Sequence, residues 1–298
     1  MSNRIANIST THLASLAGME SGIKEAFGVK DDNYNDKLIF TAMVQAGVKK
    51  IRLVGGEHYT IVNSGFMKER YLAFSFEEYF KIFKEVEDTI KDNVIVDEND
   101  DVSNKIWNLT WFLSELIFAL RTKSSMVSVL PFPKVNDYIG LFRPQLISSI
   151  GILFEKINVV NLKLPVPQKE ILSSDIKKFN EVLNSDLFGN YSLAHEELEF
   201  SYSDDLKIIA NIENKAFLLR NYFENYIDIK KLSMSIIPIT VKVIDDVCGK
   251  IPGALANTLG NALSQSLSDT RRITIYDYGD VHKELMVNHY AALSKLKK

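Results

Sequence analysis

Residues 49–62 read KKIRLVGGEHYTIV, and this stretch decides what kind of sheet the sequence predicts. Apolar and polar residues alternate on both sides of Gly55-Gly56, a pattern typical of two half-buried strands. A Gly-Gly pair supplies the positive φ angles that a tight hairpin turn requires. The stretch therefore predicts an antiparallel hairpin, to which RYLAFSF at 70–76 could add a third strand.

Helical patterns surround this hairpin. Residues 9–28 and 31–47 predict two helices before it, the second capped at Asn35 or Asp36 and ending at Gly47. After it, Ser75 and Glu78 have the spacing of a capping box, which predicts a helix that runs to about Lys91. The expected fold is therefore α+β, predominantly helical, with a small antiparallel hairpin sheet in the N-terminal third.

The stretch from Glu85 to Asp101 has eight acidic residues against one lysine, a local charge of −7. Such a charge run favours a solvated connector. It predicts a boundary between an N-terminal helix-hairpin-helix unit (1–95) and a larger, mainly helical unit (103–298).

Two strongly apolar helices are expected at the start of the larger unit, at about 102–122 and 144–157. Trp107 and Trp111 lie four residues apart in the first, and Pro144 occupies the first turn of the second. Both helices are interpreted as the centre of the core.

A later helix is expected to offer an interaction surface. Apolar residues recur there every three or four positions, which gives a helix a continuous seam for a neighbouring helix. These residues are Ile209, Ile212, Ala216, Leu219, Phe223 and Tyr226.

Residues 253–267, GALANTLGNALSQSL, contain no charge. Ala256, Gly260 and Ser264 form a stripe of small residues that lets another helix approach closely. The favoured interpretation is a helix packed inside the protein or in an oligomer interface. Membrane insertion of residues 232–268 is the alternative, although the uncharged run is shorter than the roughly 20 apolar residues that a span needs.

Two shorter stretches leave alternatives open. Residues 239–244 fit either a strand or a helix that begins at Pro238, and the helix is favoured. ITIYDY at 273–278 predicts a strand at a sheet edge, with nucleic-acid binding through Arg271 and Arg272 as the alternative.

Composition excludes several classes of protein. The chain has 298 residues, a net charge of −3 and a single cysteine, so it has no overall basic field, no internal disulfide and no Cys-rich zinc site. The first residues lack a continuous apolar stretch, which predicts a cytoplasmic protein. His282 and His289 are seven residues apart, which is not the spacing of a zincin. Neither a metal nor a cofactor is expected.

These observations favour a non-enzymatic protein that binds a protein partner or forms a homo-oligomer. The abundance of Lys, Ile and Asn suggests a bacterial or mobile-element protein, in a setting of host defence or phage conflict. A membrane-active effector and an enzyme are the alternatives. The enzyme would assemble its site from dispersed residues such as Glu57, His58, Asp245, Asp246, Cys248 and His282.

Overall fold

The structure is a computed structural model. It describes residues 4–9, 39, 42–44, 46–54, 68–72, 75–97, 99–128, 133–155, 157–161, 176–200, 206–226, 240–243 and 273–277.

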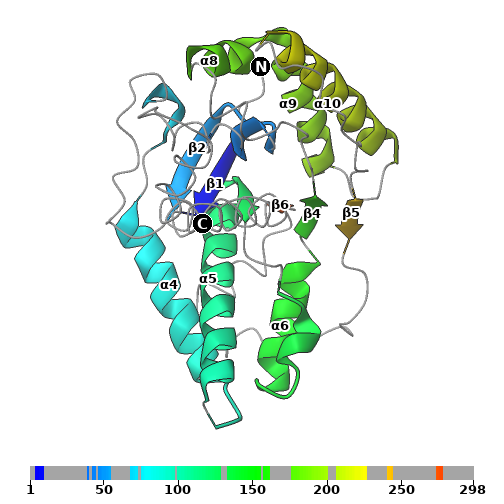
Figure 1. Cartoon of the computed structure of the whole chain (residues 1–298). Coiled ribbons are helices and arrows are strands. Elements are labelled where there is room, and N and C mark those ends of the chain that lie inside the picture. Colours follow the sequence, from blue (N-terminus) through cyan, green and yellow to red (C-terminus); the bar gives the residue numbers. More distant parts are fainter. Residues whose placement is uncertain are drawn as a thin grey trace, which may run out of the picture.

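A sheet runs through the middle of the molecule, with helices above and below it (Figure 1). The described residues form six strands in the order β2-β1-β3-β6-β4-β5. All neighbours are parallel except β5, which runs antiparallel to β4 at one edge. The strands are β1 (Ile5–Ser9), β2 (Lys50–Val54), β3 (Ser125–Ser128), β4 (Ile157–Asn161), β5 (Thr240–Val243) and β6 (Ile273–Asp277).

The predicted antiparallel hairpin is therefore wrong, and the fold is an α/β arrangement. Strand β2 does form within KKIRLV, but its ladder partner is β1, in parallel register with Ala6 opposite Ile51. Among the described residues of RYLAFSF, Tyr71 makes an isolated parallel bridge to Ile51, directly after the short helix η1 (Lys68–Arg70). The alternation identified a half-buried strand, but alternation carries no information about the direction of the neighbouring strand.

The strand order explains why helices cover both faces. From β1 the chain moves to β2 on one side, and from β2 it crosses to β3 on the other side of β1. Because parallel crossovers are right-handed, this reversal places the intervening helices on opposite faces. Two separate hydrophobic cores result, one on each face.

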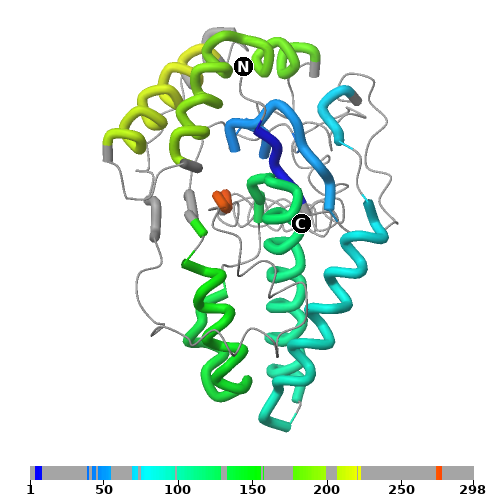
Figure 2. Tube along the Cα trace, turned by 180° about the vertical axis from the view of Figure 1, so that it is seen from behind, coloured from blue at the N-terminus to red at the C-terminus, as the bar shows by residue number. Residues whose placement is uncertain are grey.

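The first core lies between the sheet and a layer of helices at the top of Figure 1, which Figure 2 shows from behind. It contains Ile39, Met43 and Val44 of the helical segment before β2. Its other helices are α8 (Ile176–Asn184), α9 (Asp186–Phe200) and α10 (Leu206–Tyr226).

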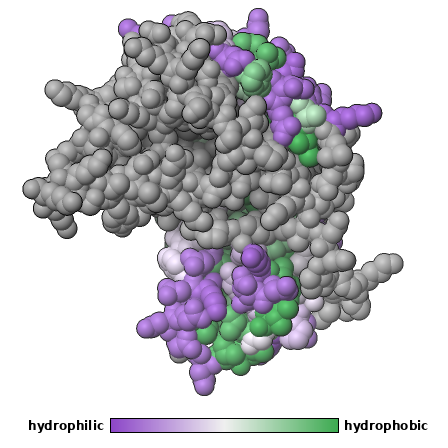
Figure 3. Space-filling model, turned by 45° about the vertical axis from the view of Figure 1, so that its right-hand side comes forward, coloured by the Kyte–Doolittle hydropathy of each residue, from purple (hydrophilic) through white to green (hydrophobic). Residues whose placement is uncertain are grey.

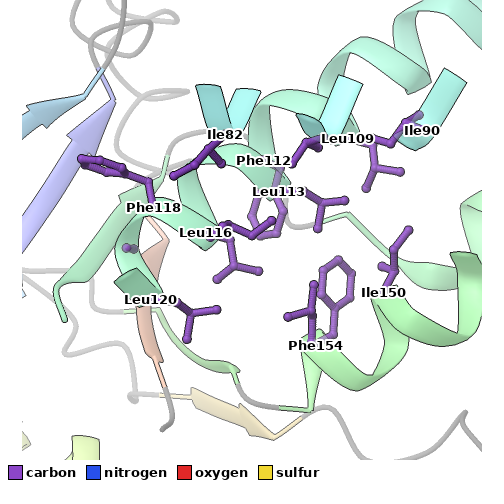
Figure 4. Packing of buried hydrophobic residues seen from close by; sticks show 14 of the residues in the cluster. Ile82, Ile90, Leu109, Phe112, Leu113, Leu116, Phe118, Leu120, Ile150 and Phe154 are labelled. Atoms are coloured by element: carbon purple, nitrogen blue, oxygen red, sulfur yellow. The ribbon is translucent and has the colours of Figure 1, made fainter. Parts of the chain in front are cut away.

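The second core lies on the opposite face. Phe112 and Phe154 meet edge to face in it, 5.8 Å between ring centroids, and Leu113 and Leu116 pack around them (Figure 4). Its helices are α4 (Phe76–Lys91), α5 (Asp100–Thr122) and α6 (Pro144–Phe154), with the short helix η2 (Val135–Tyr138) before α6.

Several predicted helices are confirmed within a few residues. Helix α4 begins after Ser75, whose Oγ accepts a hydrogen bond from Glu78 N, and ends at Lys91 as expected. Helices α5, α6 and α10 match the predictions for 102–122, 144–157 and 209–226. The segment before β2 is helical at the described positions and ends at Gly47, with φ +61°.

The two open alternatives near the C-terminus resolve differently. Residues 240–243 form strand β5, so the favoured helix is wrong; the β-branched run of Thr240, Val241 and Val243 suits a strand. Strand β6 exists, but it lies between β3 and β4 and not at an edge. Its two faces are both buried, with Ile275 in the second core and Tyr276 in the first.

The sheet takes strands from both sides of the acidic stretch. Strands β1 and β2 precede it, and β3 to β6 follow it. The stretch itself contains the end of α4, a turn, and Asn99, whose Oδ1 accepts a hydrogen bond from Val102 N and caps α5.

Candidate functional site: an aromatic surface on α4 and α5

Helices α4 and α5 pack against each other through an aromatic centre. Tyr79 of α4 is buried, and its ring meets Phe118 of α5 edge to face at 5.6 Å and Trp111 at 6.3 Å between centroids. Burial raises the pKa of Tyr79 well above its ordinary value, and the nearby charge of Glu115 adds to the shift. Tyr79 therefore stays neutral, and its ring joins α4 to α5 through contacts with Trp111 and Phe118.

Five aromatic rings continue from this centre to the outside of the helix pair, and we call them the aromatic surface. On α4, the rings of Phe76 and Phe80 stack with their centroids 5.7 Å apart. Phe83 lies against both tryptophans of α5, with centroid distances of 4.7 Å to Trp111 and 6.0 Å to Trp107. The two tryptophan rings are themselves 5.5 Å apart. Phe80 is 51% exposed and Trp107 is 52% exposed. The other three are partly buried.

Helical spacing gathers these rings on one side. Phe76, Phe80 and Phe83 follow one another at intervals of four and three residues on α4, and Trp107 and Trp111 are four apart on α5. A single exposed apolar side chain is ordinary, but a contiguous set marks a contact site. Tryptophan and other aromatic residues are enriched in protein interfaces, where they dominate the binding energy.

Acidic side chains surround the end of this helix pair, and we call them the acidic tip. Asp88, Asp92, Asp97, Asp100 and Asp101 are all exposed. Asp100 precedes Trp107 by seven residues, so the two lie on the same face of α5 about two turns apart. Lys105 pairs with Asp101 at 2.7 Å, and Lys91 pairs with Glu87 at 2.7 Å.

The same end of the molecule exposes two isoleucines. Ile95 is 54% exposed and Ile139 is 60% exposed. Their turns are joined because Ile95 N donates to Leu141 O at 3.0 Å and Arg143 N donates to Asn93 O at 2.9 Å. Figure 3 shows apolar side chains gathered at the lower end of the molecule.

A second cluster of polar groups lies in the interior, and we call it the buried polar centre. Arg4, at the start of β1, donates from Nη1 to the carbonyl oxygen of Ala46 at 2.9 Å and from Nη2 to Tyr276 Oη at 2.7 Å and Ser125 Oγ at 3.1 Å. The cation thus lies at the carboxyl end of the helix before β2, which is the favourable end of the helix dipole for a positive charge.

His195 of α9 completes this centre. Its Nδ1 lies 2.9 Å from Tyr276 Oη, and its ring meets Tyr191 edge to face at 4.5 Å. Tyr276 Oη accepts from Arg4 and shares its second hydrogen bond with Nδ1 of the neutral imidazole. Burial lowers the pKa of His195 well below its ordinary value, and the charge of Arg4 lowers it further, so the ring is neutral.

The side chains of the buried polar centre are shielded from water. Arg4 and His195 are both buried, and Nε2 of His195 has no hydrogen-bond partner among the described residues. The backbone of Gly47 packs directly against the ring of His195, because a Cβ on Gly47 would lie 2.7 Å from Cδ2 of His195. The centre ties together β1, β3, β6, α9 and the helix before β2.

A smaller polar group lies on the opposite face of the sheet. Arg52 Nη1 donates to Asn7 Oδ1 at 3.1 Å and to Ser124 Oγ at 3.0 Å, and its guanidinium lies 5.9 Å from the ring centroid of Phe118. Partial burial lowers the pKa of Arg52, although the charge of Glu78 opposes this. This group connects β1 and β2 to the end of α5.

The predicted seam on α10 packs inside the chain where its side chains are described. Ile212 and Leu219 are fully buried in the first core, and Ile209 and Ala216 pack against it. The side chains of Phe223 and Tyr226 lie outside the described residues.

The other predicted site residues lie outside the described residues. This applies to the small-residue stripe Ala256, Gly260 and Ser264, to Arg271 and Arg272, and to the dispersed enzyme candidates Glu57, His58, Asp245, Asp246, Cys248 and His282. Of the stretch 232–268, only β5 is described, and it pairs with β4. The described residues contain no metal-ligating cluster and no helix long and apolar enough to cross a bilayer.

The aromatic surface was missed because its tryptophans were assigned to the core. The signal was present in the spacing: Phe76, Phe80 and Phe83 on one helix, and Trp107 and Trp111 on the next. Sequence alone does not show that the two helices are adjacent, which is what brings the five rings together.

Comparison with known proteins assigns no relative to this arrangement. No family model matches the chain, and neither the curated proteins nor the solved structures contain a match.

Proposed function

We propose that the chain is a non-enzymatic protein that binds another protein through the aromatic surface. The observation that carries the proposal is the half-exposure of two large rings on neighbouring helices: Phe80, which stacks on Phe76, and Trp107, which contacts Phe83 and Trp111. Covering such rings with a partner removes a large apolar area from water, which is the main favourable term in protein association.

The arrangement of α10 supports the same choice of surface. At the four seam positions whose side chains are described, the seam packs in or against the first core, so this part is not free for a partner. The aromatic surface, in contrast, has its own helices already packed through Tyr79 and leaves two large rings half in solvent. Partner binding there would not require the fold to open.

The test compares two double variants purified from the natural host. Phe80→Ser with Trp107→Ser alters the aromatic surface, and Leu193→Ser with Phe217→Ser is the matched control, since these side chains of α9 and α10 are 45% and 46% exposed. Native mass spectrometry identifies any stoichiometric partner, and the complex is then rebuilt from purified components. We expect at least a tenfold loss of affinity in the first variant alone.

Thermal melts of both variants verify that the fold is retained. A rebuilt complex that binds both variants as tightly as the unaltered chain would contradict the proposal. So would a partner that is lost only in the control variant.

A second candidate function is suggested by the strand order. The chain changes direction between β1 and β3, and ligands of open parallel sheets bind beyond the carboxyl ends of the strands at such a point. The last residues of β1, β3, β6 and β4 are polar: Ser9, Ser128, Asp277 and Asn161. This favours a small polar ligand.

A thermal-shift panel of nucleosides, nucleotides and sugar phosphates tests this candidate. A ligand that binds here should raise the melting temperature of the unaltered chain, and Ser128→Ala at the end of β3 should reduce the shift. If no compound shifts the melting temperature at millimolar concentration, this candidate fails for those ligand classes.

A further inference from the structure

We infer that the partner of the aromatic surface is a cationic segment of another protein, which combines lysine or arginine residues with an apolar anchor. The inference rests on the protein-binding role proposed above and adds the chemical class of the partner. Two independent features of the surface, its charge and its rings, point to a cation.

The charge around the aromatic surface is strongly negative. Between Lys84 and Lys105 the sequence has eight acidic residues against three lysines. Lys91 and Lys105 are already held by Glu87 and Asp101. The exposed aspartates Asp97 and Asp100 therefore contribute to a negative field that raises the association rate of a cationic partner and selects against an acidic one.

The rings themselves also favour a cation. Tryptophan is the best aromatic acceptor for a cation–π contact, and a guanidinium stacks on its face. Trp107 is half exposed, and Asp100 lies on the same face of α5 about two turns away, so a cationic segment that lies along this face places one basic side chain at Trp107 and another at Asp100. An aliphatic or aromatic anchor of the partner would then cover Phe80 and Phe83.

The same charges disfavour the other occupants of an exposed aromatic surface. An anionic membrane would be repelled by the acidic tip, since surface carboxylates face the negative potential of the leaflet. Nucleic acid would be repelled in the same way, because its binding depends on neutralising phosphates with Lys and Arg. A free sheet edge is not involved, since α4 and α5 are helices.

The experiment uses the full chain and a phage library of random 16-residue peptides, selected at low salt. Peptides are kept if they bind the unaltered chain and the Leu193→Ser, Phe217→Ser control but not Trp107→Ser. We expect the retained sequences to be enriched in Lys, Arg and an aromatic or aliphatic anchor. Their affinity should fall at least tenfold between 0.05 M and 0.5 M salt.

Charge variants provide the matched comparison. Asp97→Asn with Asp100→Asn should weaken a retained peptide about tenfold at low salt. Glu181→Gln with Glu197→Gln should not, because these two exposed acids lie on α8 and α9, on the other side of the sheet.

The outcomes separate the inference from the proposed function. Retained peptides that depend on Trp107 but are uncharged or acidic would overturn the cationic class and leave the protein-binding role standing. Failure to obtain any Trp107-dependent peptide would overturn both. Self-association of the chain that disappears in Trp107→Ser would make a second copy the occupant and would also overturn the inference.

Discussion

At the scale of single residues, the buried polar centre shows how a charge is accommodated inside the first core. Arg4 donates to backbone carbonyls and to two hydroxyl groups, so much of its hydrogen-bonding capacity is used. Tyr276 then links the cation to a neutral His195. The lowered pKa of His195 has a measurable consequence, because in the unfolded chain the pKa returns to its ordinary value.

His195 should make stability fall in acid. Above about pH 6.5 the imidazole is neutral in both the folded and the unfolded chain and adds no pH dependence. Below that pH the unfolded chain binds a proton that the folded chain resists, because burial and Arg4 lower the folded pKa. The free energy of unfolding should fall by up to about 1.4 kcal/mol per pH unit from this group.

Urea denaturation at several pH values between 7.5 and 5 checks this slope. The His195→Gln variant keeps an acceptor for Tyr276 but cannot titrate, so its stability should depend less steeply on pH than that of the unaltered chain. Identical slopes in the two proteins would show that His195 is protonated as easily in the folded chain as in the unfolded one.

Gly47 should be the most sensitive of three glycines to alanine. It has φ +61°, and a Cβ would lie 2.7 Å from His195, so Gly47→Ala should cost about 2–4 kcal/mol from both causes. Gly140 has φ +84° with nothing within 4 Å, so Gly140→Ala should cost about 1–2 kcal/mol. Gly189, within α9, also has open space, and Gly189→Ala should be neutral or stabilising. Chemical denaturation would rank the three, and a Gly47→Ala cost no greater than that of Gly140→Ala would contradict the steric contact.

At the scale of elements, the helices could be predicted because their signals are local. The Ser75 cap, Pro144 and the period of 209–226 all act within one helix, and the structure places helices there. Strand partners could not be predicted, because β1 and β2 pair across more than 40 residues of sequence. The aromatic surface could not be predicted for the same reason, because it forms only when α4 and α5 pack side by side and no local signal in the sequence shows that they do.

The cap of α5 gives a prediction at this scale. Asn99 Oδ1 accepts from Val102 N at 3.0 Å, so Asn99→Ala should destabilise the protein by about 1 kcal/mol. Asn99→Gly should cost only a few tenths, because glycine is itself tolerated as a cap. Equal losses for the two variants in thermal denaturation would indicate that the side-chain hydrogen bond contributes little.

At the scale of the whole molecule, the central sheet makes the two helical layers depend on each other. Strand β1 contributes Ala6 and Ile8 to the first core, and through Asn7 it contacts Arg52 and Thr122 on the opposite face. Strand β6 likewise gives Ile275 to one core and Tyr276 to the other. Losing either layer would expose one whole face of the sheet to water.

The chain should therefore unfold as one cooperative unit. Its only two tryptophans, Trp107 and Trp111, both lie on α5, so their fluorescence reports the α4–α5 layer alone. Far-UV circular dichroism reports all the helices, including α9 and α10 on the opposite face. The two signals should share one midpoint in urea, because neither layer keeps its core when the sheet is lost. A tryptophan transition at clearly lower urea would mean that α4 and α5 unfold separately from the layer beyond the sheet, and the apolar side chains of β3 and β6 that face them, Met126, Ile273 and Ile275, would then have to be stable in water.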